Sequence, residues 1–367
     1  MISDAVIEGT RQLSVFDQVA EMEHEQVVFC HDQSTGLKAI IAIHNTVLGP
    51  SMGGTRMWHY VTDNEAITDA LRLSRGMTFK NAIAGLNIGG GKAVIIGDAR
   101  KQKNEALMRR FGKFIESLGG RYVTAEDVNM TTRDMEYIRM ETRHVAGMSE
   151  AMGGSGDPSP MTAYGVYIGM KAARKKVIGS DSLAGAKVLV QGAGNVGSNL
   201  VDYLVKDGAI VSVSDIFEEK LGPISSKYKV DIIPAEDIFE QDIDIYAPCA
   251  LGATLNDDSI GKMKCSIVAG GANNQLLDET KHGNMLIDMG IVYAPDFLIN
   301  GGGITNIYYD YIANYNKELV MKQVENIYET CLSVFDKSEN ENITPQEAAM
   351  AIAANRIAAI GNNKLSY

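Results

Sequence analysis

The order of apolar and polar residues divides the chain into two parts of different character. Residues 26–45 contain two apolar runs separated by a turn-forming segment at 32–36, which predicts two strands joined by a turn. Apolar residues then recur at helical spacing over two segments, one from about Asp63 and one over 104–118. Their apolar faces comprise Ala66, Ile67, Ala70, Leu71 and Leu73 in the first helix, and Leu107, Met108, Phe111, Ile115 and Leu118 in the second.

The second part begins with a segment of small residues at 148–157, which we interpret as a crossing between domains. A helix is predicted from about Pro158 to Lys176. Short apolar runs then alternate with helical segments, which predicts an α/β fold with a parallel, doubly wound sheet. The runs are KVLVQ (187–191), AIVSVSD (209–215), DIDIYAPC (242–249), SIVAGG (266–271) and GIVYAP (290–295).

The C-terminal region is predicted to be helical. The residues Thr344-Pro345-Gln346-Glu347 form a capping box with proline at the first helical position, ahead of an alanine-rich helix over about 345–361. No strand follows this helix that could extend the sheet. We therefore assign 1–147 to a first domain and 148–339 to a second domain, and we expect 340–367 to pack back on the first.

Composition narrows the range of functions. The net charge of −12, without a stripe of lysine and arginine, disfavours nucleic acid as a partner. No apolar stretch approaches the ~20 residues of a membrane helix, and the N-terminus shows no secretory signal. The four cysteines are scattered, and neither they nor the six histidines have metal-binding spacing. We expect a cytoplasmic protein with reduced cysteines and no metal.

A glycine fingerprint follows the first predicted strand of the second part. The segment Gly192-Ala193-Gly194-Asn195-Val196-Gly197 has the spacing G-x-G-x-x-G and begins a predicted helix. Glycine at these positions permits a tight turn, close approach of the main chain to a pyrophosphate and close packing of helix on strand. The helix N-terminus offers N–H groups to phosphate. A glycine-rich turn that binds no ligand is the alternative interpretation.

An acidic residue lies at the position where a dinucleotide-binding site holds the ribose. Asp215 ends the next predicted strand, about 20 residues beyond the fingerprint. Its carboxylate can accept hydrogen bonds from a ribose diol and repels a 2′-phosphate, so we expect NAD, and not NADP, as the cofactor. A solvated acid at the end of a strand is the alternative.

Two lysines lie in the most glycine-dense segment of this acidic chain. Lys80 and Lys92 flank a stretch without a carboxylate, whose glycines would let a small substrate approach the main chain closely. One ammonium group could neutralise an anionic substrate, while the second, buried beside a like charge, would lose its proton more readily and suit a general base. Glu126 and Asp127 follow a short predicted strand, where a carboxylate could transfer a proton. From spacing alone, two solvated surface lysines remain an equal alternative.

Several longer blocks, together with the fingerprint, resemble the Glu/Leu/Phe/Val family of amino-acid dehydrogenases, most of all its leucine-specific members. They are GPSMGGTRMW (49–58), GMTFKNAIAGLNIGGGKAVIIGD (76–98), TAEDV (124–128), PSPMTAYGV (158–166), IYAPCALGAT (245–254), GGANNQL (270–276) and IVYAPDFLINGGGI (291–304). The resemblance covers nearly the whole chain. It implies an N-terminal α/β substrate and oligomerisation domain, a Rossmann-type dinucleotide-binding domain and an active-site cleft between them.

The resemblance also implies an activity: reversible, NAD-dependent oxidative deamination of an L-amino acid to a 2-oxo acid and ammonia, by a homo-oligomer that in some members is an octamer. Lys80 corresponds to the lysine that holds the substrate α-carboxylate, and Lys92 to the catalytic lysine that activates water. Asp127 corresponds to the acid that exchanges a proton with the amino group. The expected substrate pocket comprises Gly53, Gly54, Met52, Ala125, Asn274, Ile304 and Ile307.

The part of this pocket that receives the substrate side chain is apolar. It offers no cation to the γ-carboxylate of glutamate, which would be left buried and unpaired. Ala125, where a glycine would open space for a ring, favours leucine, isoleucine and valine over phenylalanine. Departures from the family pattern near the pocket are Asn129, Met130, Gly301 and Thr305. We expect a branched-chain amino-acid dehydrogenase; the alternatives are a phenylalanine dehydrogenase and, from another class, a catalytically silent NAD-binding scaffold.

Overall fold

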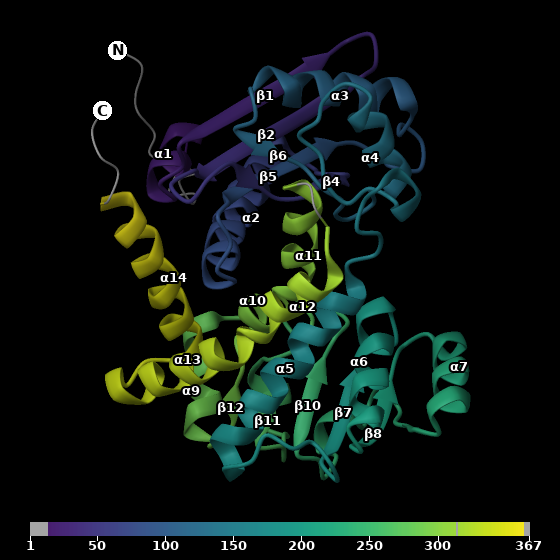
Figure 1. The fold of residues 1–367 in the computed structure, drawn as a ribbon, viewed down its shortest axis with the longest axis vertical. Helices are drawn as coiled ribbons and strands as arrows, with labels where there is room; N and C mark the ends of the chain where they lie inside the picture. Colours follow the sequence, from purple (N-terminus) through teal and green to yellow (C-terminus); the bar gives the residue numbers. More distant parts are fainter. Residues whose placement is uncertain (1–13, 313–314, 363–367) are drawn as a thin grey trace, which may run out of the picture. The chain divides into compact units, whose positions relative to one another are not determined.

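The computed structural model of the chain describes residues 14–312 and 315–362. Internal contacts group the chain into two compact units, whose elements are labelled in Figure 1. Unit 1 contains the described residues up to Thr46, together with Pro50–Thr78 and Gly89–His144. Unit 2 contains Val47–Gly49, Phe79–Ile88 and the described residues from Val145 onward. The predicted domains also included 1–13 and 363–367, which lie outside the described residues.

Unit 1 is built on a six-stranded mixed sheet. The strand pair predicted at 26–45 is confirmed, because β1 (Gln26–Asp32) and β2 (Leu37–Asn45) are antiparallel neighbours. β2 pairs in turn with β5 (Gly89–Ile96), the strand that carries Lys92. The shorter strands are β3 (Ser51–Met52), β4 (Thr55–Trp58) and β6 (Tyr122–Val123), in the order β1-β2-β5-β3-β6 with β4 also paired to β5.

The two helices predicted for this part of the chain are present. The first, α2 (Asp63–Ile83), buries Ala70 and Leu71 against Ile40 and Val94 of the sheet. The second, α3 (Glu105–Ser117), contacts β1 and β2. Two shorter helices, α1 (Val15–Glu21) and α4 (Thr132–Arg139), each begin with a capping box. Over the described ranges, none of the helices is long and apolar enough to cross a membrane.

A close approach of α2 to β5 explains one residue of the glycine-dense segment. A Cβ atom on Gly90 would lie 2.0 Å from Oγ1 of Thr78 and 2.2 Å from its main-chain nitrogen. No side chain larger than a hydrogen atom fits between a helix and a strand at that separation. We expected the glycines of this segment to admit a substrate, but at Gly90 glycine allows the helix to lie against the strand.

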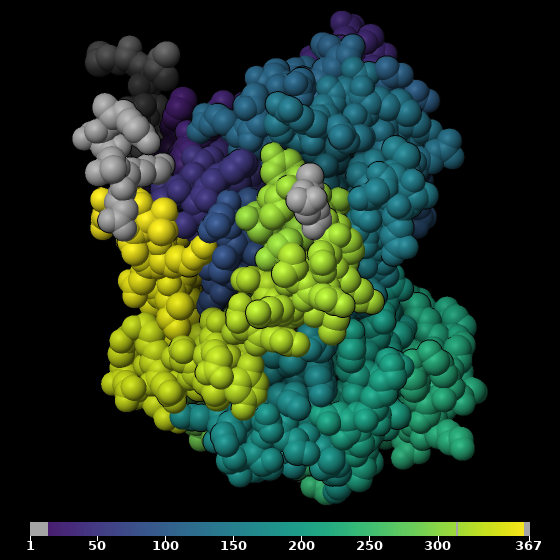
Figure 2. All heavy atoms as spheres, viewed as in Figure 1, coloured from purple at the N-terminus to yellow at the C-terminus, as the bar shows by residue number. Residues whose placement is uncertain are grey.

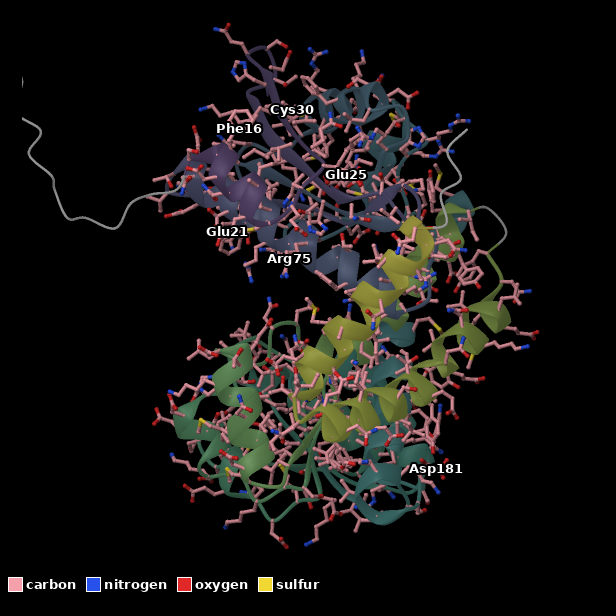
Figure 3. All side chains as sticks on the ribbon, turned by 90° about the vertical axis from the view of Figure 1, so that its left-hand side faces the viewer. Phe16, Glu21, Glu25, Cys30, Arg75 and Asp181 are labelled. Atoms are coloured by element: carbon pink, nitrogen blue, oxygen red, sulfur yellow. The ribbon has the colours of Figure 1, made fainter. Side chains whose placement is uncertain are left out.

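Two buried histidines lie where α2 meets the rest of unit 1. The rings of His24 and His44 meet edge to face, with centroids 4.7 Å apart. Nε2 of His24 contacts Oγ of Ser74 at 2.7 Å, and Nδ1 of His44 contacts Oγ1 of Thr78 at 2.7 Å. Burial is the main cause that lowers the pKa of each imidazole to about 4. The charge of Arg75, labelled on α2 in Figure 3, lowers both pKa values further.

Unit 2 contains a six-stranded sheet whose strands are all parallel (Figure 1). Its order, β12-β11-β10-β7-β8-β9, confirms the doubly wound arrangement. The predicted runs contain β7 (Lys187–Gln191), β8 (Ile210–Ser214), β10 (Ile245–Pro248), β11 (Ile267–Val268) and β12 (Val292–Tyr293). The remaining strand, β9 (Asp231–Ile232), is an exposed edge strand that we did not predict.

Apolar residues cover both faces of this sheet. Val188 and Val190 of β7 belong to a core shared with α5 (Ser159–Ile178) and α6 (Asn195–Lys206), whereas Leu189 belongs to the core on the other face. Because side chains alternate along a strand, a continuous apolar run serves both cores. α5 and α6 are the helices predicted after Pro158 and after the fingerprint.

The remaining helices of unit 2 are α7 (Glu218–Tyr228), α8 (Asp257–Ile260), α9 (Glu279–Asp288), α10 (Asp296–Ile299), α11 (Gly302–Tyr311), α12 (Lys317–Glu325) and α13 (Ile327–Glu341). Short 3₁₀ turns occur at Glu150–Met152 and Ile238–Glu240. Atoms of α11 and α12, yellow-green in Figure 2, form part of the molecular surface.

The C-terminal helix belongs to unit 2, where its Arg356 also donates to the main-chain oxygens of Ala82 and Leu86, two residues that we had assigned to the first domain. α14 (Pro345–Asn362) begins with the predicted capping box, in which Glu347 accepts hydrogen bonds from the N–H and hydroxyl groups of Thr344. Its buried residues Ala348, Ala349 and Ala353 belong to the core of unit 2. We expected this helix to pack on the first domain. An alanine-rich helix carries few large side chains that could indicate its partner, so its sequence predicts a helix and leaves its neighbours undetermined.

Candidate active site

Unit 1 brings Lys92 and Asp127 together as an ion pair. Nζ of Lys92 lies 2.7 Å from Oδ2 of Asp127, and the exposed fractions of the two side chains are 7% and 25%. Lys92 extends from β5, while Asp127 follows the bridge between Thr55 and Glu126 beyond β6. The stretch between Lys80 and Lys92 holds no carboxylate, and the partner of Lys92 comes from a distant segment.

The negative charge of Asp127 is stabilised by two cations. Burial works against its ionisation, but the charges of Lys92 and Arg56 outweigh burial and hold the pKa of this carboxyl below its ordinary value. Arg56, on β4, donates from Nε to Oδ2 of Asp127 at 3.1 Å. Arg56 was not predicted as a site residue, although it lies within the block GPSMGGTRMW. A cation on a short strand between two buried residues was the available signal.

The other expected residues of unit 1 lie at or just beyond the ends of β3 and β6. Met52 and Ala125 are buried. A Cβ atom on Gly54 would lie 2.9 Å from Cβ of Asp127. Glycine at this position therefore allows the aspartate to lie close to the main chain of residue 54. The main-chain oxygen of Gly53 accepts a hydrogen bond from the hydroxyl of Tyr122 at 2.7 Å. Unit 1 therefore brings the lysine, the aspartate and the expected pocket glycines together.

Lys80 lies in the last turn of α2 and belongs to unit 2. Its Nζ atom lies 3.5 Å from Oδ1 of Asn273, which also accepts an N–H of Asn300 at 2.8 Å. Asp296 is buried, and burial raises the pKa of its carboxyl although Lys80 acts in the opposite direction. The sequence analysis did not predict the two asparagines or Asp296 as neighbours of the lysine. Asn274, which it did predict, is exposed and adjacent to Asn273.

The two expected pocket residues of α11 lie on one face of that helix. Ile304 is partly buried and Ile307 is buried, three positions apart. The hydroxyl of Thr305 donates to the main-chain oxygen of Gly301 at 2.9 Å. The hydroxyl group of Thr305 is therefore hydrogen-bonded within the helix. This departure from the family pattern adds no unpaired polar group beside Ile304 and Ile307.

The departure at Asn129 has a backbone explanation. Asn129 has a φ of 61°, in the left-handed region that glycine and asparagine adopt most readily. Its side-chain amide donates to the main-chain oxygen of Met57 at 3.0 Å. Asparagine therefore supplies the same backbone conformation that a glycine would supply at this position.

The glycine fingerprint forms the predicted turn from β7 into α6. Gly192 has a φ of 108°, and a Cβ atom on Gly197 would lie 1.9 Å from the main-chain oxygen of Gly192. A Cβ atom on Gly194 would meet nothing within 4 Å, so the space in front of this residue is open. Asn195 and Val196 begin α6, and no side chain of the described residues caps this helix. Its first N–H groups are suited to a phosphate.

Asp215 lies directly beyond β8 and holds the fingerprint turn. Its carboxylate accepts hydrogen bonds from the N–H groups of Ala193 at 2.7 Å and Phe217 at 2.9 Å. The carboxylate thus stands beside the turn, at the position where a dinucleotide-binding site holds a ribose. The residues of this part of unit 2 fit a dinucleotide cofactor.

The parallel sheet, the glycine turn and Asp215 define a dinucleotide-binding protein of the Rossmann type. Residues 24–144 match the family model described as "Glu/Leu/Phe/Val dehydrogenase, dimerisation domain". Residues 153–218 and 215–364 match the model described as "Glutamate/Leucine/Phenylalanine/Valine dehydrogenase". The chain belongs to the Glu/Leu/Phe/Val dehydrogenase family, whose members are oxidoreductases that require a nicotinamide cofactor.

Individual relatives are similar over almost the full chain. Leucine dehydrogenase of Bacillus subtilis (strain 168) is 52% identical over 345 residues, which cover 94% of each chain. L-tryptophan dehydrogenase of Nostoc punctiforme is 46% identical over 343 residues, covering 94% of this chain and 96% of the relative. The crystal structure of the L-tryptophan dehydrogenase from Nostoc punctiforme superposes with a TM-score of 0.85 at 43% identity, covering 95% of this chain and 100% of the other.

Proposed function

We propose that this protein catalyses the reversible, NAD-dependent oxidative deamination of a branched-chain L-amino acid, with leucine preferred over valine and isoleucine. The products are the 2-oxo acid, ammonia and NADH. The observation that carries the proposal is the buried ion pair between Lys92 and Asp127. The 52% identity to a leucine dehydrogenase supports the substrate class.

In this proposal each polar residue has one task. Lys80 binds the α-carboxylate of the substrate, while a nicotinamide ring bound by unit 2 supplies the hydride acceptor. Lys92 takes a proton from the water that adds to the substrate carbon and stabilises the negative charge that develops there. Asp127 exchanges a proton with the amino group that leaves as ammonia. The 2.7 Å contact between the ammonium and the carboxylate places the two groups that handle these protons side by side.

The apolar character of Met52, Ala125, Ile304 and Ile307 supports an aliphatic substrate. A glutamate side chain would place an unpaired carboxylate against apolar side chains, at a cost of several kcal/mol. Discrimination among aliphatic side chains is weaker, because one methylene group changes binding in a pocket by about 1–3 kcal/mol.

The preference for NAD is supported by the acidic surroundings of the ribose position. Asp215 is followed by the exposed residues Ile216 and Phe217 and by Glu218 and Glu219, with no arginine that would accept a 2′-phosphate. A carboxylate at this place accepts hydrogen bonds from a free 2′-hydroxyl group and repels a phosphate.

We also propose that the active protein is a homo-oligomer, with an octamer as one possible assembly. The family's own description of residues 24–144 as a dimerisation domain supports this assignment. The molar mass of the purified protein, measured by light scattering, gives the number of subunits, and a 39.7 kDa monomer would contradict the proposal.

A panel of initial rates tests the activity. NADH formation is measured with leucine, valine, isoleucine, phenylalanine, tryptophan and glutamate, each with NAD and with NADP. We expect the highest kcat/KM for leucine with NAD and the lowest for glutamate. Faster turnover of phenylalanine or tryptophan than of leucine would identify an aromatic amino-acid dehydrogenase. Binding of NAD without oxidation of any of the six would identify a silent scaffold.

A further inference from the structure

Two cations contact one oxygen of Asp127. Nζ of Lys92 lies 2.7 Å from Oδ2, and Nε of Arg56 lies 3.1 Å from the same atom. The contacts seen in the described part of the chain leave the other oxygen, Oδ1, without a partner. The carboxylate is therefore held through one oxygen, with the second available to a substrate.

Arg56 is itself fixed by a second carboxylate. Its Nη1 atom donates to Oδ2 of Asp69, on α2, at 3.1 Å. Tyr60 donates its hydroxyl to the same oxygen at 2.7 Å, which orients Asp69 toward the arginine. Because the guanidinium group is a planar fork, its contact with Asp69 on one side sets its orientation toward Asp127 on the other.

The two cations differ in what they can do during a reaction. A lysine can release and recover a proton, whereas an arginine stays charged in proteins. Burial opposes the charge of Arg56, but Asp127 and Asp69 outweigh burial and raise its pKa above the ordinary value. If Lys92 alone faced Asp127, the loss of its proton would leave a largely buried carboxylate without a counter-charge.

We propose that Arg56 is a positioning residue for the deamination reaction. Anchored by Asp69, it keeps Asp127 ionised while Lys92 is without its proton, and it holds Oδ1 of Asp127 toward the amino group of the substrate. This inference rests on the proposed function for its role in the reaction, whereas the coupling of Arg56 to Asp127 can be tested without any activity.

Few groups can titrate around Asp127. Among the described residues, the charged groups that contact it are Lys92 from β5 and Arg56 from β4. Two tyrosines, Tyr60 after β4 and Tyr122 on β6, also interact with it, and burial raises the pKa of both phenols, so they stay neutral in the working range. The acidic side of the pH profile therefore includes the protonation of Asp127, and a change at Arg56 moves that contribution.

The first experiment compares the pH profile of kcat/KM for leucine in the wild type, Arg56→Gln and Arg56→Lys. We expect Arg56→Gln to move the acidic limb upward by about one pH unit or more, because an opposite charge at this distance shifts a carboxyl by roughly that amount. Turnover should fall at least about tenfold, and Arg56→Lys should restore part of the shift. Cofactor binding, measured by NADH fluorescence, should not change. A uniform loss at every pH, without movement of the limb, would overturn the proposal.

Arg72 provides a matched control. It lies on α2, its side chain is 56% exposed, and it contacts Asp69 through Oδ1 at 3.3 Å. It therefore shares the carboxylate that anchors Arg56 but does not bridge to Asp127. Arg72→Gln should leave the acidic limb in place. If Arg72→Gln moved the acidic limb as far as Arg56→Gln does, the position of the limb would depend on the total positive charge near Asp69. The specific contact of Arg56 with Asp127 would then not determine it, and the proposal would be overturned.

The second experiment uses unfolding, so it does not depend on catalysis. Arg56→Gln, Asp127→Asn and the double variant are unfolded in urea at pH 7. We expect the double variant to lose less stability than the sum of the single variants, because each single change leaves a partner without its counter-charge. Additive losses would overturn the inference. If the wild type oxidises no amino acid but the coupling is present, the proposed function fails and the contact between Arg56 and Asp127 stands.

Discussion

Lys92 and Asp127 form a buried ion pair at 2.7 Å, although they come from segments far apart in the chain. β5 carries the lysine and pairs with β2, β3 and β4, so its backbone is fixed on both sides. The aspartate follows a bridge between Thr55 and Glu126. Because both backbones belong to one hydrogen-bonded framework, the distance between ammonium and carboxylate is set by the sheet.

Asp127→Asn keeps the shape of this side chain and removes its charge. We expect kcat for leucine to fall by about 10²–10⁴, the usual contribution of a general acid–base group, with unchanged NADH binding. Steady-state rates and fluorescence titration measure the two quantities. Asp98→Asn, whose partly exposed side chain lies just beyond β5, is the control and should retain full activity. A loss of less than about threefold for Asp127→Asn would contradict its assignment.

The contact between Gly90 and Thr78 makes a prediction about stability. Gly90→Ala places a methyl group about where the helix backbone already lies, so it should lower the free energy of unfolding by about 1–3 kcal/mol or prevent folding. Gly76→Ala is the matched control, since it lies exposed on the same helix and its Cβ atom would meet nothing within 4 Å. It should stabilise the protein by about 0.5–1 kcal/mol. Urea denaturation measures both, and equal effects would contradict the packing argument.

The buried histidine pair predicts how stability depends on pH. In the unfolded chain each imidazole binds a proton near pH 6.5, but in the folded protein the pKa of His24 and of His44 is about 4. The unfolded state therefore binds more protons between these values, so this contribution to stability is complete above about pH 6.5 and is lost as the pH falls toward 4. The loss should reach on the order of 3 kcal/mol for each imidazole.

Urea denaturation between pH 7 and about pH 4.5 measures this effect. His44→Gln should flatten the dependence, because the substituted side chain has no proton to bind in this range. His31→Gln, on the exposed side of β1, is the control and should leave the slope unchanged. A wild-type stability that is independent of pH from 7 to 4.5 would contradict the burial of two neutral imidazoles.

Asp215 should determine the choice of cofactor. Asp215→Asn removes the negative charge that repels a 2′-phosphate and keeps an acceptor oxygen for one of the two N–H groups, those of Ala193 and Phe217, which donate to different oxygens of the carboxylate. We expect the ratio of kcat/KM for NAD over NADP to fall at least about tenfold, which corresponds to about 1.4 kcal/mol. Glu218→Gln removes a nearby charge at the start of α7 as a control. An equal change in both variants would assign the preference to the overall charge.

Much of the fold could be predicted from local pattern. The alternation and runs of apolar residues identified β1, β2 and five strands of the parallel sheet, because burial on one or both faces leaves a direct pattern in the sequence. The two-residue edge strand Asp231–Ile232 left no such pattern, since it is short and both residues are exposed. The placement of α14 depends on contacts with distant segments, which its alanines do not specify.

The residues of the candidate site also fall into two groups: those that the sequence predicted and those that only the structure shows. Lys80, Lys92 and Asp127 were identified because their sequence blocks are distinctive, and the fingerprint because its glycines are required by the turn. Arg56 and Asp69 were missed because their importance lies in a bridge between a strand and a helix, which spacing along the chain does not reveal. The glycine-dense segment was interpreted as an opening for substrate, whereas Gly90 is required by the packing of α2.

The most direct test of the central claim compares Lys92→Ala and Lys80→Ala in the oxidation of leucine with NAD. Rates of NADH and ammonia formation are measured together with NADH binding. We expect equal amounts of both products in the wild type, a loss of kcat of roughly a thousandfold in Lys92→Ala with intact NADH binding, and mainly an increase in the KM for leucine in Lys80→Ala. Similar, mild losses in both variants would contradict the assignment of proton transfer to one lysine and substrate binding to the other.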